Sequence, residues 1–137
     1  MKNMKNILIL DDNNDILKAL QLGLCACLKD CNVLTALNGE KGGEILKDTA
    51  VDLIVTDLDM PVINGFRFIE RTRRDHPSVP VYVMAGNCLP DVMERLNALG
   101  VRRVIAKPFP FENLAAMITE ELKLEKPSSF QGEAGHA

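Results

Sequence analysis

Short, continuously apolar runs alternate with amphipathic segments along the chain, and this alternation constrains the fold more than any other feature. The apolar runs lie at 7–10, 33–36, 53–55, 81–84 and 104–106. Such runs are typical of strands that are buried on both faces of a sheet. Parallel strands need a helical crossover between them, and the intervening segments supply one each. The sequence therefore predicts an α/β domain with a doubly wound, five-stranded parallel sheet and helices on both faces.

The helices between these strands are predicted from apolar spacing and from end signals. Asn13 or Asn14 is the expected N-cap of the first helix, Pro90 suits the first turn of the fourth, and Gly100 suits the position after its end. A weaker helix is expected over 40–47, where two adjacent glycines lower the helix propensity. The apolar side chains expected to face the sheet are Leu17, Leu20, Leu24 and Leu28; Phe66 and Ile69; Val92, Leu96 and Leu99; and Leu114, Ile118 and Leu122.

The size and charge of the chain exclude several classes of protein. With 137 residues it forms one domain, predicted over 1–125, followed by a flexible tail over 126–137 that is too short for a DNA-binding output module. A net charge of −3 and an aromatic content of 4% argue against nucleic-acid binding. No apolar stretch is long enough for a membrane span or a signal peptide, so a cytoplasmic location is predicted.

The four cysteines are predicted to be reduced and to pack as small hydrophobic residues. Cys25, Cys27 and Cys31 crowd one segment, and Cys88 stands alone. Their spacing matches neither a paired zinc motif nor a disulfide framework, and the chain has no secretory signal. Redox sensing by Cys88 is not favoured, because little nearby in sequence would lower its pKa.

The arginines of the segment 66–74 form the strongest local concentration of positive charge. These are Arg67, Arg71, Arg73 and Arg74. The spacing favours a solvated helix face over an anion-binding site.

Charged residues follow three of the predicted strands. Asp11 and Asp12 follow the first, Asp57 ends the third, and Lys107 follows the fifth. Neighbouring parallel strands bring their carboxyl ends together, so the three carboxylates should lie close enough to need neutralising. Mg²⁺ is the natural counter-ion, and a lysine can contact a phosphoryl oxygen. This set predicts phosphoryl-transfer chemistry with an aspartate as acceptor.

These residues, in their surroundings, resemble the receiver domain of bacterial two-component response regulators. The resemblance spans about residues 5–123, and its most specific part is the run Asp-x-x-Met-Pro-x-x-x-Gly over 57–65. It implies the flavodoxin-like strand order 2-1-3-4-5. It also implies that Asp57 accepts a phosphoryl group from a sensor histidine kinase or phosphotransfer protein, with no turnover of an external substrate. A downstream protein would then bind the face made by the fourth helix, fifth strand and fifth helix.

The same resemblance assigns the other site residues. Mg²⁺ would be held by Asp11, Asp12 and Asp57 with the backbone carbonyl of Asp59. Lys107 would contact the phosphoryl group, and the peptide bond that follows it is often cis in this family.

Two positions depart from the family pattern. Receivers usually carry Thr or Ser where this chain has Ala85, and Tyr or Phe where it has Val104. The hydroxyl and the aromatic ring normally relay phosphorylation to the signalling face, so the metal and acceptor site is expected to be intact while the usual relay is absent.

Two other functions stay open on the sequence. The departures at Ala85 and Val104 fit a receiver-like interaction module that works without phosphorylation. Asp57 and Asp59 also fit the Asp-x-Asp of haloacid-dehalogenase-type phosphatases, although Pro61 and the acidic pair after the first strand do not. A flavin-binding module is less favoured, because no phosphate-binding loop follows the first strand.

Overall fold

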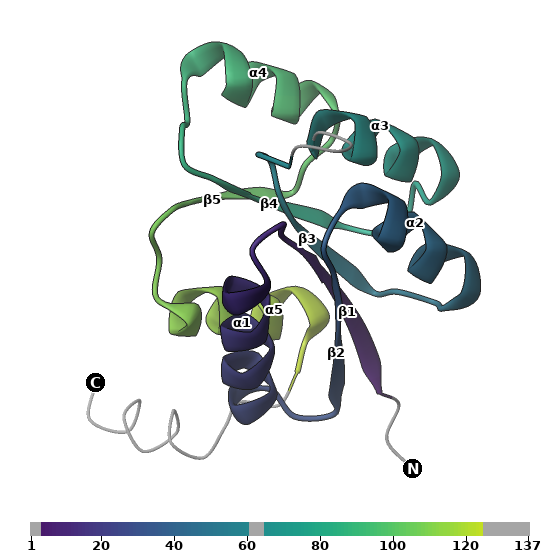
Figure 1. The fold of residues 1–137 in the computed structure, drawn as a ribbon, viewed down its shortest axis with the longest axis vertical. Helices are drawn as coiled ribbons and strands as arrows, with labels where there is room; N and C mark the ends of the chain where they lie inside the picture. The colour runs from purple at the N-terminus through teal and green to yellow at the C-terminus, as the bar shows by residue number, and fades with distance from the viewer. Residues whose placement is uncertain (1–3, 61–64, 125–137) are drawn as a thin grey trace.

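The computed structural model describes residues 4–60 and 65–124 and contains five strand–helix units (Figure 1). The sheet is parallel throughout, in the order β2-β1-β3-β4-β5, which confirms the predicted fold class and strand order. The elements are β1 (Lys5–Leu10), α1 (Asn14–Cys27), β2 (Cys31–Ala36), α2 (Gly39–Asp48), β3 (Leu53–Asp57), α3 (Gly65–Asp75), β4 (Val81–Ala85), α4 (Pro90–Ala98), β5 (Arg103–Ala106) and α5 (Phe111–Leu122).

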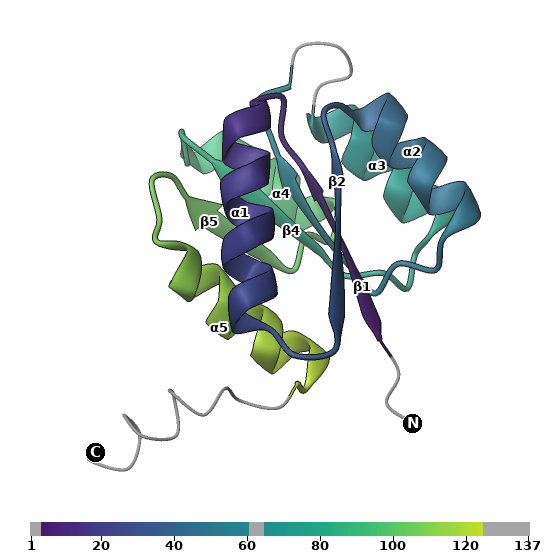
Figure 2. The same cartoon turned by 60° about the horizontal axis from the view of Figure 1, so that its bottom comes forward.

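The helices form two layers around the sheet. Helices α1 and α5 lie on one face, and α2, α3 and α4 lie on the other (Figures 1 and 2). Along β1, Ile7 and Ile9 enter the apolar cluster under α1 and α5, whereas Leu8 and Leu10 enter the cluster on the opposite face. All four are fully buried. Burial on both faces is the reason that the strands are continuously apolar.

The predicted helix ends are confirmed. Asn13 is the N-cap of α1, and its side-chain oxygen accepts the N–H groups of Asp15 and Ile16 at 2.9 and 3.2 Å. Pro90 is the first residue of α4. Gly100 follows the end of α4 with a φ of +77°, a backbone angle that glycine adopts at no steric cost.

The inner face of α3 differs from the prediction. Phe68, Ile69 and Thr72 are buried. Phe66, predicted as an inner residue, packs against the same cluster but is only half-buried. The buried stripe runs at i, i+1 and i+4, which turns Phe66 toward α4, where Arg95 lies 3.9 Å from the centre of its ring. In α4 itself, Leu96 alone is fully buried.

The cysteines are free thiols, and their predicted burial is wrong for two of them. Cys27 and Cys31 are half-buried against the cluster under α1 and α5, and burial raises the pKa of Cys31 to about 11. Cys25 and Cys88 are exposed, because one lies on the outer side of the last turn of α1 and the other in the loop before α4.

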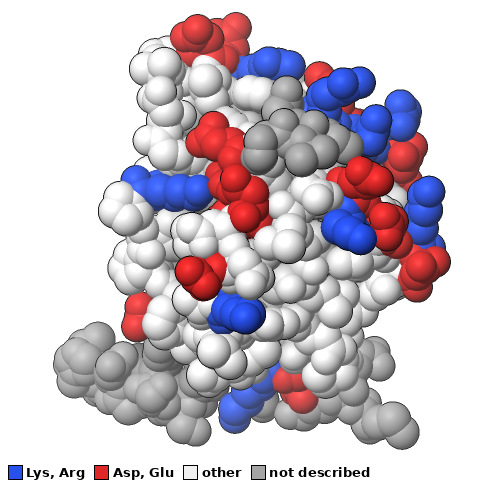
Figure 3. Space-filling view, in the orientation of Figure 1, with Lys and Arg blue, Asp and Glu red and all other residues white. Residues whose placement is uncertain are grey.

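The arginines of α3 lie on a surface of mixed charge. Arg67, Arg71 and Arg74 are exposed, and Arg73 is half-buried and donates to the backbone oxygen of Val79 at 2.8 Å. Basic and acidic side chains are interspersed over α2 and α3, at the upper right of Figure 3. This agrees with the predicted solvated helix face.

Two predictions fall outside the described part of the chain. The flexible tail over 126–137 and residues 61–64 of the Asp-x-x-Met-Pro-x-x-x-Gly run lie in the segments that the structure does not describe. Within 4–60 and 65–124, no helix has the length and apolar character that crossing a membrane would require.

Candidate metal centre

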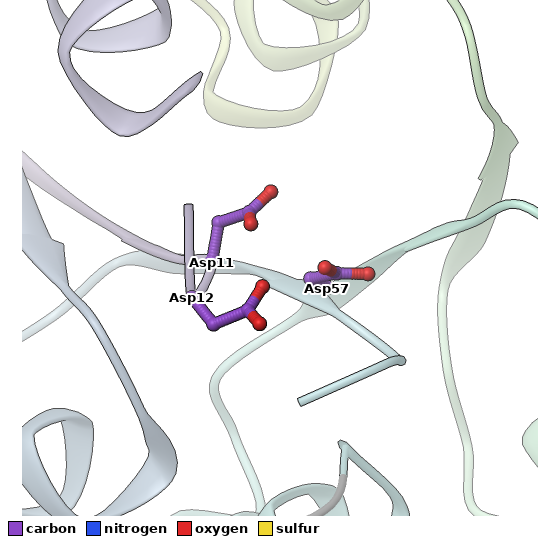
Figure 4. Close-up of side chains that lie close together, drawn as sticks. All are labelled: Asp11, Asp12 and Asp57. Carbon is purple, nitrogen blue, oxygen red and sulfur yellow. The ribbon is translucent and has the colours of Figure 1, made fainter. Parts of the chain in front are cut away.

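Three carboxylates meet at the carboxyl ends of the two central strands. Asp11 and Asp12 follow β1 and Asp57 ends β3, and an oxygen from each lies within 4.8 Å of the others (Figure 4). The register explains the meeting, because Leu10 is paired with Thr56 and the next residue of each strand is an aspartate. Among the described residues this is the one group of His, Cys, Asp or Glu side chains spaced to hold a metal ion.

The burial of the three side chains is unequal. Asp11 and Asp57 are 1% and 2% exposed, whereas Asp12 is open to solvent. Two carboxylates are therefore held out of water side by side, and a third faces them from the surface. Removing like charges from water in this way is unfavourable unless a cation compensates them.

Lys107 compensates part of this charge. It follows β5, and its Nζ lies 2.9 Å from Oδ1 of Asp57 and 3.9 Å from Oδ2 of Asp11. Its backbone N–H donates to the oxygen of Ala85 at 2.9 Å, and its peptide bond to Pro108 is cis, as the family resemblance implied. One ammonium group faces three carboxylates, so a net negative charge remains.

Asp11 shows where a further cation is needed. Its Oδ1 accepts the N–H of Asn13 at 3.0 Å, but its buried Oδ2 has no hydrogen-bond partner among the described residues. Burial raises the pKa of this carboxyl group, and the charge of Asp57 raises it further, against the lowering effects of the Asn13 N–H and of Lys107. An all-oxygen donor set with one unsatisfied buried oxygen fits a hard divalent cation such as Mg²⁺.

The chain bends at Leu58 as it leaves Asp57. The N–H of Asp59 donates to Oδ1 of Asp57 at 3.2 Å, the N–H of Leu58 donates to the oxygen of Met84 at 3.0 Å, and the N–H of Gly65 donates to the oxygen of Leu58 at 3.0 Å. The side chain of Asp59 is exposed. The predicted role of its carbonyl as a metal ligand stays a prediction.

The two departing positions bring no polar side-chain group to this site. Ala85 ends β4 and is buried, and its backbone oxygen accepts the N–H of Lys107. Val104 is half-buried and packs against the apolar cluster on the α2–α4 face. Next to Ala85, a Cβ at Gly86 would meet nothing within 4 Å, so the space beside the end of β4 is open.

Sequence reasoning missed a contact that joins α3 to α4 beside the site. Arg95 lies over the ring of Phe66 and is 3.8 Å from a carboxylate oxygen of Glu70. The sequence alone does not indicate that an aromatic residue at the start of one helix contacts an arginine in the next. The contact becomes evident only when the fold places the two helices side by side.

The comparison with known families agrees with the geometry. The family described as "Response regulator receiver domain" matches residues 7–119. A probable transcriptional regulator, ycf27, of Cyanidium caldarium is 32% identical over 124 residues, which cover 89% of this chain and 48% of that protein. The autoinducer 1 sensor kinase/phosphatase LuxN of Vibrio harveyi is 34% identical over 99 residues, which cover 68% of this chain and 11% of that protein. The chain thus spans about half the length of the first relative and a small part of the second.

Solved structures share the fold. A CheY-like receiver domain protein of Methanospirillum hungatei superimposes with a TM-score of 0.82 at 22% identity, covering 88% of this chain and 95% of that one. The chemotaxis response regulator CheY4 of Vibrio cholerae gives 0.79 at 24% identity, covering 87% and 99%. At these sequence identities, the similarity to the solved structures shows a shared fold and nothing further. The matched residues include all or most of every strand of the sheet and all three acidic residues of the centre, and the chain belongs to the response regulator receiver domain family.

Proposed function

We propose that this chain is the phosphoacceptor of a two-component phosphorelay and that Asp57 accepts the phosphoryl group. One observation carries the proposal: Asp57 is a buried carboxylate in contact with Lys107 at 2.9 Å and within 4.8 Å of two further carboxylates. A nucleophile, a cation for the phosphoryl oxygens and a ligand set for Mg²⁺ are the parts that phosphoryl transfer needs.

In the proposed reaction, the Asp57 carboxylate attacks the phosphorus of a phosphohistidine on a sensor kinase or phosphotransfer protein. The new bond joins an Asp57 oxygen to phosphorus, the P–N bond breaks with its electron pair going to the ring nitrogen, and the leaving imidazole takes up a proton from water. Lys107, which contacts Asp57 in the resting protein, pairs with a phosphoryl oxygen. Bound Mg²⁺ would neutralise the charge that develops on the phosphoryl oxygens.

The ligands for that ion are proposed to be Asp11, Asp12, Asp57 and the carbonyl of Asp59. The unsatisfied Oδ2 of Asp11 supports this assignment. The only chemistry assigned to the chain is transfer to, and hydrolysis from, its own Asp57.

Incubation with acetyl phosphate and MgCl₂, followed by intact mass measurement, tests the proposal. The wild type is expected to gain the mass of one phosphoryl group, and chelation of Mg²⁺ should prevent the gain. Asp57→Asn should not gain it, because an amide is not a nucleophile for phosphorus. Stoichiometric labelling of Asp57→Asn would contradict the assignment.

The proposed output is a protein contact on the face formed by α4, β5 and α5. Leu89 and Met93 support this choice, because both are large apolar side chains that lie exposed at the start of α4. A kinase or phosphotransfer protein would act as the phosphodonor and a different protein would bind this face. The cytoplasmic location stays a prediction.

A second candidate function is an interaction module that works without phosphorylation. It is favoured by Ala85 and Val104, which lack the hydroxyl and the ring of the usual relay. The same mass experiment separates the two, since a module of this kind need not label at Asp57. Membership in the receiver family leaves no support for the alternative of a phosphatase that uses Asp57 and Asp59.

A further inference from the structure

We propose that Gly65 is a positioning residue for the metal- and phosphoryl-binding groups. Its lack of a side chain lets α3 begin directly against the backbone of Leu58, and this contact fixes the turn that carries Asp57 and Asp59. The inference rests on the proposed function of the site.

The contact between the two segments leaves no room for a methyl group. A Cβ at Gly65 would lie 2.6 Å from both Cα and the carbonyl oxygen of Leu58, and 2.9 Å from its carbonyl carbon. Non-bonded carbon atoms settle at about 3.5–4.0 Å, so the two backbones would have to separate by on the order of 1 Å. Gly65 does not have a left-handed φ, unlike Gly100, so the close approach alone requires glycine.

The backbone of Leu58 cannot move away from an added methyl group at position 65 without displacing residues of the site. Its side chain is buried in the cluster under α2–α4, and its N–H is bonded to the oxygen of Met84 at 3.0 Å. It is the residue between Asp57 and Asp59, which are themselves joined by a 3.2 Å hydrogen bond from the Asp59 N–H to Oδ1 of Asp57. Any shift of the Leu58 backbone is therefore passed to the acceptor carboxylate and to the proposed carbonyl ligand.

Mg²⁺ is sensitive to shifts of this size. It binds oxygen ligands at about 2.0–2.1 Å in near-octahedral geometry. Groups that only orient metal ligands typically change metal affinity by about 10–100-fold when they are altered. We therefore expect Gly65→Ala to weaken Mg²⁺ binding by at least about tenfold, with a matching loss of the labelling rate at low Mg²⁺.

The chain supplies two matched glycine-to-alanine controls, both on α2. A Cβ at Gly43 would meet nothing within 4 Å, so Gly43→Ala adds the same methyl group without crowding. A Cβ at Gly42 would lie 2.6 Å from Cδ2 of Leu10 and 3.2 Å from Cε1 of Phe68, so Gly42→Ala crowds side chains in the core instead of the turn after Asp57. Gly42→Ala thus reports what destabilisation alone does to the site.

The experiment compares the four proteins by calorimetric titration with MgCl₂, by labelling with acetyl phosphate and by urea unfolding without metal. The proposal expects Gly43→Ala to keep the Mg²⁺ affinity of the wild type with equal or higher stability, because alanine favours a helix interior over glycine. It expects Gly42→Ala to lose stability while keeping Mg²⁺ affinity within about twofold. Gly65→Ala should lose affinity beyond anything seen for Gly42→Ala. In amide NMR spectra, the metal-free Gly65→Ala protein should show its largest changes at Leu58 and Asp59.

Three outcomes would overturn the inference. The first is a Gly65→Ala protein that binds Mg²⁺ as the wild type does. The second is a loss of affinity no greater than that of Gly42→Ala. The third is a Gly65→Ala protein that fails to fold even in trimethylamine N-oxide, which favours compact states, because Gly65 would then serve the fold and not the site. Failure of the wild type to bind Mg²⁺ or to label would instead refute the proposed function.

Discussion

Replacing Asp11 with asparagine is expected to stabilise the metal-free protein while weakening its binding of Mg²⁺. The substitution keeps the shape of the side chain and the acceptor oxygen that the N–H of Asn13 uses at 3.0 Å. It removes a charge that is 1% exposed and places an amide N–H₂ where the carboxylate oxygen Oδ2 has no hydrogen-bond partner among the described residues. An oxygen of Asp12 and one of Asp57 lie within 4.8 Å of an oxygen of Asp11, so carboxylate acceptors lie close to the new amide group.

The size of the effect follows from the distances. At an effective dielectric constant of about 20, two unit charges at 4 Å interact by about 4 kcal/mol. The attraction of Asp11 to Lys107 at 3.9 Å is therefore nearly cancelled by its repulsion from Asp57, whose carboxylate lies within 4.8 Å. What remains is the cost of a buried oxygen without a hydrogen-bond partner among the described residues, about 1–3 kcal/mol. Asp11→Asn should accordingly raise the free energy of unfolding by about 1–2 kcal/mol at neutral pH.

The gain should depend on pH, because burial raises the pKa of Asp11. In the window between its unfolded pKa of about 3.9 and its higher folded pKa, the folded wild type binds more protons than the unfolded chain, so wild-type stability falls as pH rises. The variant has no such carboxyl group. Its advantage should be present at neutral pH and should vanish as pH falls below the unfolded pKa.

Urea unfolding across this pH range, with and without MgCl₂, measures the effect. Added Mg²⁺ should stabilise the wild type more than the variant and so reduce or reverse the difference. Asp12→Asn is the matched control: because Asp12 is exposed, its metal-free stability should change by no more than about 0.5 kcal/mol while Mg²⁺ binding weakens. An Asp11→Asn protein that is less stable than the wild type without metal would refute the reasoning and make Asp11 a structural partner of Lys107.

Three further predictions concern the end of β4, helix α4 and the contact between β4 and α5. Ala85→Thr should extend the amide NMR shift changes caused by a beryllofluoride phosphoryl mimic from the site into α4, because a hydrogen bond from a hydroxyl to a charged oxygen contributes about 1.5–3 kcal/mol. Wild-type shift changes that already extend through α4 and β5 would contradict this. Arg95→Ala should speed amide hydrogen exchange in α4 by removing its contact with the ring of Phe66, worth about 0.5–1 kcal/mol at an exposed site, and unchanged exchange would count against it. Tyr82→Phe should lower the free energy of unfolding by about 1–3 kcal/mol, since the buried hydroxyl donates to Glu121 at 2.9 Å, and wild-type stability would disprove that role.

Local rules were enough to predict the fold from the sequence. The apolar runs located all five strands, and the cap residues Asn13, Pro90 and Gly100 located helix ends, because each depends on the residue's own backbone preferences. The strands β1 and β2 begin earlier than their apolar runs, at Lys5 and Cys31, because backbone pairing continues where the side chains no longer need to be apolar.

The meeting of the acidic residues was also predictable, because parallel strands end at the same edge of a sheet. Their separate environments were not. Nothing in the pair Asp11–Asp12 says which side chain is buried, since neighbouring residues at a strand end point in different directions. The exposure of Cys25 and the turn of Phe66 toward Arg95 also depend on how helices pack, which residue spacing alone does not determine.

The parts of the chain that form the acidic centre do not depend on the two atypical positions. The register of β1 against β3 brings Asp11 to Asp57, and Ala85 supplies Lys107 with only a backbone oxygen, which any residue at that position would offer. Loss of the hydroxyl at this position therefore leaves the proposed chemistry intact. It only removes the side-chain hydrogen bond through which the phosphoryl group would contact the end of β4. A Cβ at Gly86 would meet nothing within 4 Å, so the space beside the end of β4 is open. Any movement passed on to α4 has to displace a helix with one fully buried residue, Leu96. The half-buried Val92 and Leu99 also pack against the core, and Arg95 contacts α3. A helix with few buried contacts requires little free energy to move. Phosphorylation therefore needs to supply only a small free energy to displace α4 without the hydroxyl.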